Sequence, residues 1–253
     1  MRASEICAAI EQFAPLSIQE SWDNSGLIVG SPSDEVSGVL VGFDCTPALV
    51  DEAVSLGVNM IITHHPLIFK GIRHISEDEP VGEALIKAIR AGILVYAAHT
   101  TADKVLAGVS GAMAAKLGLK EVEVLDESGL GAIGNIPAPL SYAASIDLLK
   151  RAFGCKVVRA SADPLVKISR VAVCGGSGAE FIDTARLKGA QLYVSADISY
   201  HRFFTPRGFA VADIGHFESE VEIVDILLSV VRKNFPNFAA YACAHKENPV
   251  KYY

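Results

Sequence analysis

Histidine and carboxylate side chains recur together at the ends of short apolar runs in this sequence. Apolar runs precede both His99 and His216, and a carboxylate, Asp103 or Glu220, follows each histidine four residues later. Imidazole and carboxylate groups together bind divalent transition metals, and α/β proteins place their sites at strand ends. The repeated spacing therefore indicates metal chemistry.

A third apolar run, Met60–Thr63, ends in the adjacent pair His64 and His65, and Pro66 follows. Neighbouring strand residues point to opposite sides, so both imidazoles can reach one place only where the strand ends. Pro66 cannot donate to a strand ladder and so favours that ending. The pair could serve two metals, or one metal with the second imidazole as a proton carrier. Alternatively, one histidine is a hydrogen-bonded core residue and the other is exposed.

The two carboxylates of these runs have a second explanation. Asp103 and Glu220 each suit the first turn of a helix, where an acidic side chain stabilises the exposed amides. Their repetition after similar strands favours ligation. Taken with the histidine pair, they could support a mononuclear or dinuclear site of the zinc, manganese or iron type.

Further polar residues follow buried strands. Asp44 either orients an imidazole at the neighbouring strand end or contributes only to the following turn. Asp197 and His201 follow the corresponding strand of the second half, and either could act as a general acid or base beside a metal. His74 and His245 have no such partner, and we expect them at the surface.

A β-α-β unit positions the first of these residues. Val39–Asp44 predicts a buried strand, Thr46 and Pro47 begin a helix as N-cap and first helical residue, and Gly57 ends it. Val58–Thr63 predicts the next strand, so the pair is parallel with a right-handed crossover.

The same unit recurs with identical spacing from Val171 to Gly189, and a second strand then ends at Ser195. We interpret this as an internal duplication, with chance similarity of generic β-α-β units as the alternative. The fold prediction is α/β: two related lobes with mixed sheets and a metal site in the cleft between them. The predicted lobes are residues 1–125 and 126–253, with the C-terminal helix and strand able to pack back on the first lobe. The segment Asp126–Pro139 predicts a loop or short strand at the boundary.

Two further loops contain residues that could contact a ligand. Gly175-Gly176-Ser177-Gly178 resembles a phosphate-cradling turn but lacks the residues of a P-loop, so tight strand-to-helix packing is the better explanation. Trp22, the only tryptophan, opens the polar stretch Trp22–Gly26. Its indole could form a wall for a base or ring, or could simply pack against the protein.

Composition limits the possible functions. The 253 residues carry a net charge of -7, which gives no electrostatic case for binding nucleic acid. Mean hydropathy is high at +0.34, yet no apolar run approaches the roughly 20 residues that span a bilayer. The first helix begins without a signal-peptide pattern, which predicts a cytoplasmic protein. The five scattered cysteines predict buried, reduced thiols.

In order along the chain, the motifs around Trp22–Leu27, Thr63–Pro66, Ala98–Asp103 and Gly215–Glu220 resemble the Nif-three-like family. Members of that family are often described as type 2 homologues of GTP cyclohydrolase I. The resemblance covers essentially the full chain. It implies two related α/β lobes, a dinuclear metal site in the cleft between them, and a ring-like homohexamer.

The resemblance also implies the ligands. Carried over position by position, the metal ligands are His64, His65, Asp103, His216 and Glu220, with His99 next to the site. They would hold two divalent ions per subunit, described in the family as zinc, iron or manganese. The sequence departs from the family pattern at Thr101, Asp197 and Tyr200, where relatives often carry Asn, Glu and His.

The sequence therefore predicts a metal-dependent hydrolase that acts on a nucleotide or phosphoester, with His201, His99 or Asp197 moving the proton. The alternative is a non-enzymatic, metal-binding hexameric scaffold, or a protein that stores or delivers metal. A nucleic-acid-binding ring is a third possibility, which the acidic net charge disfavours.

Overall fold

Two compact units make up the chain in the computed structural model, which describes residues 1–244, 246 and 248–253. The first unit combines residues 1–102 with 223–253, and the second unit is residues 103–222. The first boundary thus falls earlier than the predicted position at 125, because helix α5 (Val109–Lys116) packs in the second core and β5 (Lys120–Val124) is a strand of the second sheet. The C-terminal helix and strand belong to the first unit. His245 lies outside the described residues.

A mixed five-stranded sheet forms the centre of the first unit, in the order β1-β4-β3-β2-β11. β1 is antiparallel to β4, and the other neighbouring strands are parallel. The strands are β1 (Gly26–Val29), β2 (Val39–Gly42), β3 (Met60–Thr63), β4 (Leu94–Ala97) and β11 (Ala240–Ala242). Every residue of β2, β3 and β4 is buried, as expected for parallel strands covered on both faces.

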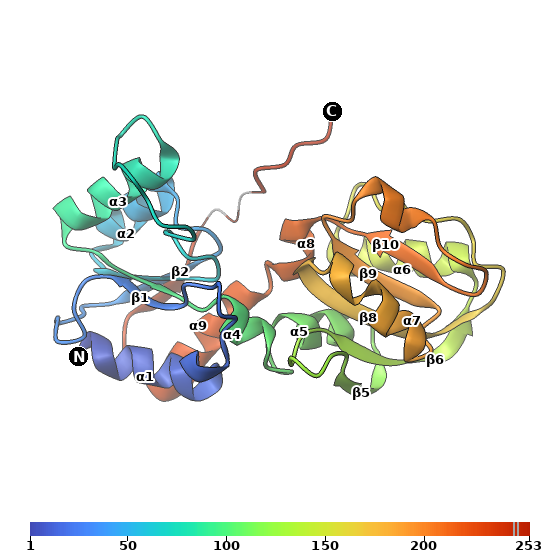
Figure 1. Ribbon diagram of the computed structural model, residues 1–253. Coiled ribbons are helices and arrows are strands. Elements are labelled where there is room, and N and C mark those ends of the chain that lie inside the picture. The colour runs from blue at the N-terminus through green and yellow to red at the C-terminus, as the bar shows by residue number, and fades with distance from the viewer. Residues whose placement is uncertain (245, 247) are drawn as a thin grey trace. The chain divides into compact units, whose positions relative to one another are not determined.

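Helices cover both faces of this sheet. Figure 1 shows α2 and α3 on one face and α1 and α9 on the other. Their bounds are α1 (Ala3–Phe13), α2 (Pro47–Leu56), α3 (Pro80–Ala91) and α9 (Ile223–Asn234). The predicted start and end of α2 are confirmed: the Leu49 amide donates to Thr46 Oγ1 at 3.2 Å, and Gly57 follows the helix with φ 70°.

A mixed six-stranded sheet forms the second unit, in the order β5-β6-β8-β9-β10-β7. β8, β9 and β10 are parallel, and the outer pairs are antiparallel. The strands are β5 (Lys120–Val124), β6 (Ala132–Leu140), β7 (Arg159–Ala160), β8 (Ile168–Ser177), β9 (Leu192–Ala196) and β10 (Ala210–Asp213). Two mixed sheets in an α/β chain confirm the predicted fold class.

Two apolar clusters hold the second sheet to its helices. One joins the sheet to α5 (Val109–Lys116) and α6 (Tyr142–Phe153) through residues such as Met113 and Leu149. The other joins it to α7 (Ile182–Leu187) through Ile182 and Ala185. The opposite placement of α6 and α7 about the strands is visible in Figure 1.

The glycine- and proline-rich stretch at the predicted boundary is mainly a strand. β6 pairs with β8 from Ala132 to Asn135, and pairing then breaks before resuming at Leu140. Pro137 and Pro139 fall in this interruption, where the ladder does not require an amide from them. Turn-forming composition therefore marked the irregular end of a long strand.

The two parallel strand pairs share one register. Val39 lies opposite Met60 in the first unit, and Val171 lies opposite Leu192 in the second. These are the positions that the sequence comparison of the two halves equates, which is consistent with the predicted duplication. The third strands differ slightly at their ends. The Ala98 amide donates to the carbonyl of Thr63, and the Ile214 amide to that of Ser195. The next residue is His99 in one unit and Gly215 in the other, so His216 lies one position further on.

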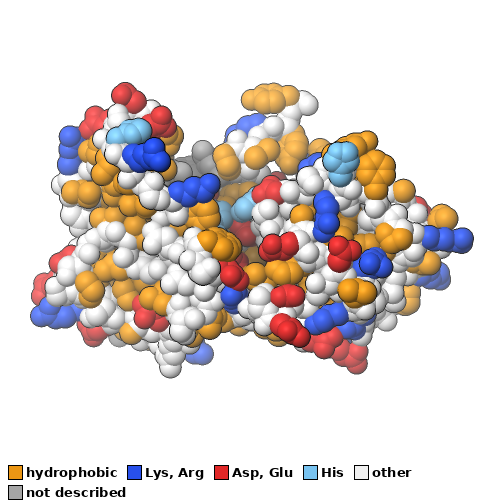
Figure 2. All heavy atoms as spheres, viewed as in Figure 1, with side chains coloured by type: hydrophobic (Ala, Val, Ile, Leu, Met, Phe, Trp, Pro, Cys, Tyr) orange, Lys and Arg blue, Asp and Glu red, His pale blue; other side chains and the backbone are white. Residues whose placement is uncertain are grey.

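The cysteines and His74 have the burial that the sequence predicts. All five cysteines are free and buried, and His74 is exposed, as predicted. Within the described part of the chain, none of the helices is long and apolar enough to cross a bilayer. On the face shown in Figure 2, Asp and Glu side chains are interspersed with Lys and Arg, and no basic patch dominates that face.

The left-handed conformation of Gly57 at the end of α2 can be tested by substitution. A methyl group on Gly57 would meet no atom within 4 Å, so Gly57→Ala isolates the cost of the left-handed conformation. We expect the free energy of unfolding to fall by about 1 kcal/mol, measured by urea denaturation. Gly71→Ala is the matched control, because its added methyl is equally unobstructed and its φ lies outside the left-handed region. Equal losses in the two variants would contradict the explanation.

Candidate metal centre

Four imidazoles of the predicted site are fixed in the same way, through Nδ1. The acceptors are the Ala98 carbonyl for His64 (2.9 Å), Asp44 for His65 (2.7 Å), Asp23 for His99 (2.7 Å) and Asp197 for His216 (2.8 Å). An oxygen acceptor on Nδ1 selects the tautomer in which Nε2 can ligate a metal or accept a proton. Metal-ligating histidines are commonly held by such outer partners.

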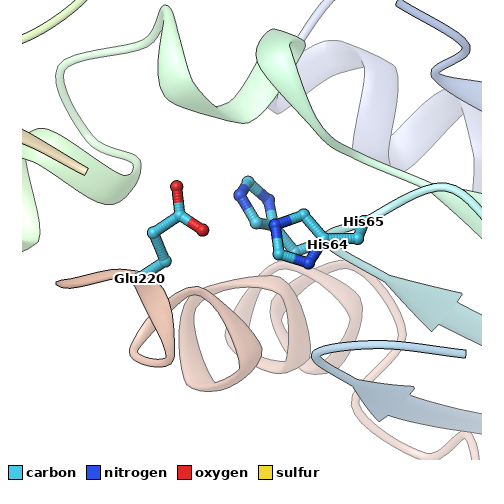
Figure 3. A group of neighbouring side chains, drawn as sticks. All are labelled: His64, His65 and Glu220. Atoms are coloured by element: carbon cyan, nitrogen blue, oxygen red, sulfur yellow. The ribbon is translucent and has the colours of Figure 1, made fainter. Parts of the chain in front are cut away.

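The histidine pair closes β3 in the first unit, as Figure 3 shows. His64 is fully buried, and the side chain of His65 is 23% exposed. The two ring centroids lie 4.9 Å apart, and Phe43 packs against both rings. The contact with Asp44 favours the first of the two explanations of that residue, the orientation of an imidazole.

His99 lies beside this pair. Its ring centroid is 5.4 Å from that of His64 and 5.5 Å from that of His65. The strand register produces this proximity, since β3 and β4 are parallel and end at the same edge of the sheet. The first unit thus brings together three imidazoles from two neighbouring strand ends.

Asp23 is a functional candidate that the sequence reasoning did not identify as such. Its side chain is fully buried and accepts hydrogen bonds from His99 Nδ1, the Thr100 amide and the Ser25 hydroxyl. Burial by itself raises the pKa of Asp23, but the hydrogen bonds from His99 and Thr100 and the charge of His99 lower it well below its usual range. Asp23 therefore stays anionic against His99. The signal available in the sequence was a carboxylate in the polar stretch after Trp22.

The second unit presents His216 and Glu220 on α8 (His216–Glu220), and Figure 3 shows Glu220 on this helix. His216 Nε2 lies 2.9 Å from Glu220 Oε2, one helical turn away, while its Nδ1 is bound to Asp197. Asp197 has a φ of 53°, a left-handed conformation that Asp tolerates better than most residues. Asp197 is the first residue after β9.

Asp213 stabilises the arrangement around His216. It ends β10, is 5% exposed, and accepts from the amides of Ile198 and Gly215, both at 3.0 Å. Ile198 follows Asp197, and Gly215 precedes His216, so one carboxylate holds the neighbours of both partners. Arg159 donates to the same carboxylate at 2.9 Å. No local sequence pattern predicted this role, because Ile198 and Arg159 are 15 and 54 positions away from Asp213.

Two glycines near the end of β8 make room for Glu220. A methyl group on Gly176 would lie 2.3 Å from Glu220 Oε1, and one on Gly175 would lie 3.2 Å from Glu220 Cγ. Gly176 also has φ 59°, and its amide donates to Ser219 at 2.9 Å. These glycines therefore serve close packing against α8, and close packing is the explanation that the sequence favoured over phosphate binding.

Asp103 ends α4 (Thr100–Asp103), and its charge acts on buried Cys174, as the charge of Glu220 does. Burial raises the pKa of the Cys174 thiol, and the charges of Asp103 and Glu220 raise it further. Both carboxylates thus act on one buried sulfur in the second unit. The thiol stays protonated, so the negative charge here belongs to the two carboxylates.

The other predicted proton carriers of the second unit have different surroundings. Asp197 is bonded to His216, as described above. His201 is exposed and packs against Tyr200 and Phe204 with ring centroids 5.3 and 6.4 Å away. It lines a small cavity of about 110 Å³ together with residues of α7, and none of the described lining residues is a predicted metal ligand.

The donor types suit a transition metal. His64 and His65 in the first unit and Glu220 in the second unit each offer a donor atom of the kind that holds a metal ion. Mixed imidazole and carboxylate ligands are typical of zinc, iron and manganese sites. The residues therefore fit a divalent ion of this class, with each imidazole already oriented by its outer partner.

Comparison with known proteins places this geometry in context. The family model described as Duf34/NIF3 (NGG1p interacting factor 3) matches residues 1–249. A GTP cyclohydrolase 1 type 2 homolog of Clostridium acetobutylicum is 35% identical over 229 residues, covering 87% of this chain and 85% of the relative. A protein of the same description from Lactococcus lactis is 33% identical over 255 residues, covering 98% of each chain.

Solved structures agree with the fold. A hypothetical protein of Staphylococcus aureus is similar with a TM-score of 0.92 at 27% identity, covering 100% of this chain and 99% of that one. Reduced HcgD from Methanocaldococcus jannaschii is similar with a TM-score of 0.82 at 26% identity, covering 97% of this chain and 98% of that one.

Gly176 provides a test of the carboxylate position. We expect Gly176→Ala to displace Glu220 and to weaken divalent-ion binding about 10- to 100-fold, measured by competition with a chelator. Gly154→Ala is the matched control, because Gly154 has a similar φ of 66° but no atom within 4 Å of the added methyl. Both variants lose backbone stability, and only the first should lose metal affinity. Unchanged affinity in Gly176→Ala would show that Glu220 does not contribute to binding.

Proposed function

Because the chain belongs to the Duf34/NIF3 family, we propose that it is a metal-dependent hydrolase with a dinuclear site for divalent ions. The observation that carries this proposal is the common fixation of four imidazoles through Nδ1. An imidazole that only fills a core has no need of a carboxylate on Nδ1, and three of the four have one.

The proposed ligands are three imidazoles and two carboxylates: His64, His65, Asp103, His216 and Glu220. Five donors exceed the three or four protein ligands of a typical single catalytic zinc, which supports two ions. The mixture of nitrogen and oxygen donors supports zinc, iron or manganese as the metal. The family resemblance further supports a homohexamer as the assembled form.

The proposed reaction is hydrolysis of a nucleotide or phosphoester, and the names of the relatives as homologues of a GTP cyclohydrolase support a nucleotide. Divalent ions, when bound, supply Lewis acidity toward the substrate and the attacking water. The chain's own residues orient the ligands and move protons. The net charge of -7 is consistent with a small-molecule substrate and does not support a nucleic-acid partner.

His99 is the best supported proton carrier among the three predicted. Anionic Asp23 holds its Nδ1, which leaves proton transfer to Nε2, and His64 and His65 lie beside the ring. Asp197 would act as a positioning residue for His216 instead, and His201 has aromatic neighbours. A buried carboxylate behind a catalytic imidazole stabilises the protonated ring during transfer.

Removing ligands tests the metal site. We expect His64→Ala and Glu220→Gln to bind divalent metal at least about tenfold more weakly and to lose turnover of GTP and of bis-p-nitrophenyl phosphate. Metal content is measured by inductively coupled plasma mass spectrometry, and folding by circular dichroism. His74→Ala and Glu222→Gln are exchanges of the same types outside the ligand set. A wild-type protein that purifies without divalent metal under non-chelating conditions would overturn the site.

Removing the partner of His99 tests the proton carrier. We expect Asp23→Asn to lower kcat by about 10²- to 10⁴-fold with little change in KM or metal content. His99→Ala should lose a similar factor, and the double variant should lose little more, because the two residues act as a unit. Asp147→Asn, an exposed carboxylate on α6, is the control. Additive losses in the double variant would contradict the coupling.

A further inference from the structure

Two exposed aromatic rings stand beside His99 in the first unit. Trp22 is 58% exposed and Phe69 is 44% exposed, and their ring centroids lie 5.9 Å apart in an edge-to-face arrangement. The His99 ring is 6.1 Å from Trp22 and 5.8 Å from Phe69. Single exposed hydrophobic residues need no explanation, but a group of two rings at a candidate catalytic imidazole does.

The backbone that carries these rings is firmly anchored. Asp23, the residue after Trp22, has a fully buried side chain that accepts hydrogen bonds from His99 and the Thr100 amide. Asn24 Nδ2 then donates to the carbonyl of Ile68 at 2.6 Å, and Ile68 immediately precedes Phe69. The two aromatic residues are therefore tied to each other by their neighbours in sequence, while their own rings remain in solvent.

We propose that Trp22 and Phe69 form a ring-binding subsite, which holds a planar heteroaromatic ring of the substrate beside His99. A preorganised aromatic surface binds such rings by stacking. The buried contacts of Asp23 already order this surface before the ligand binds, so binding loses less conformational entropy. This inference rests on the proposed function and sharpens it, because a nucleotide carries a planar heteroaromatic base and a phosphoester need not. Of the two proposed substrate classes, nucleotide and phosphoester, the subsite therefore favours the nucleotide.

The subsite can be tested with ligands that differ only in the ring. The metal-loaded full chain is titrated with ribonucleoside 5′-monophosphates and, in parallel, with ribose 5-phosphate. Trp22 is the only tryptophan, so its fluorescence reports directly on the subsite. We expect nucleotides to quench this emission with saturation, and ribose 5-phosphate to leave it unchanged.

Variants then assign the effect to the indole. By calorimetry, Trp22→Ala should bind nucleotides about 5- to 100-fold more weakly, and Trp22→Phe should retain most of the affinity. Phe204→Leu is the control, because Phe204 is an exposed ring of the second unit. Equal nucleotide affinity in Trp22→Ala and wild type would overturn the subsite. So would a change of oligomeric mass in Trp22→Ala with unaltered binding, since the rings would then serve contact between copies.

Failure of the subsite and failure of the hydrolase give different results. Nucleotide binding that depends on Trp22, without any turnover, would keep the subsite and overturn the hydrolase. Turnover of bis-p-nitrophenyl phosphate that depends on Glu220, with no nucleotide effect on Trp22, would keep the hydrolase and overturn the subsite.

Discussion

The candidate site depends on one kind of interaction, a hydrogen bond from imidazole Nδ1 to a fixed oxygen. A histidine ring can turn about two bonds and exchange its proton between two nitrogens, so its type alone does not define a ligand. For His64 the oxygen is a strand-end carbonyl, and for His65, His99 and His216 it is a carboxylate. The parallel register of β2, β3 and β4 fixes where Asp44 and the Ala98 carbonyl lie, whereas Asp23 lies in the segment before β1.

The two units use this interaction with different backbone support. In the first unit, strand ends supply the three rings and the acceptors of His64 and His65, and the segment before β1 supplies Asp23. In the second unit, Asp197 adopts a left-handed conformation and Gly176 admits Glu220 against the backbone. The close approach of a carboxylate is thus achieved by local strain and by the absence of a side chain. Strain of this kind is common at functional sites because packing elsewhere compensates for it.

The ends of several helices and strands were predictable from residues that are neighbours in the sequence. Thr46, Pro47 and Gly57 mark the ends of α2, and Pro66 marks the end of the strand before the histidine pair. Asp23 and Asp213 were not predicted as site residues because their decisive partners are distant in sequence; Asp23 binds a histidine 76 positions away, and Asp213 binds an arginine 54 positions away. The division of the two units at residue 102 has no local sequence signature for a related reason. α5 and β5 complete the second sheet and core although they precede the glycine-rich segment. A contact between segments that are distant in the sequence does not change the local composition of either segment, so the sequence alone does not reveal it.

The surroundings of His99 bear on whether the proposed site would catalyse a reaction or only store metal. A protein that only stores or delivers metal needs donors and their orientation, which His64, His65, His216 and the two carboxylates would supply. It has no need of a further imidazole held by an anionic, buried Asp23 next to the ligand pair. It also has no need of exposed aromatic rings tied to that same carboxylate. Burying the charge of Asp23 is costly unless its hydrogen bonds are retained, and those bonds are the ones that orient His99 and anchor Trp22. The arrangement therefore favours a reaction at this position over simple binding.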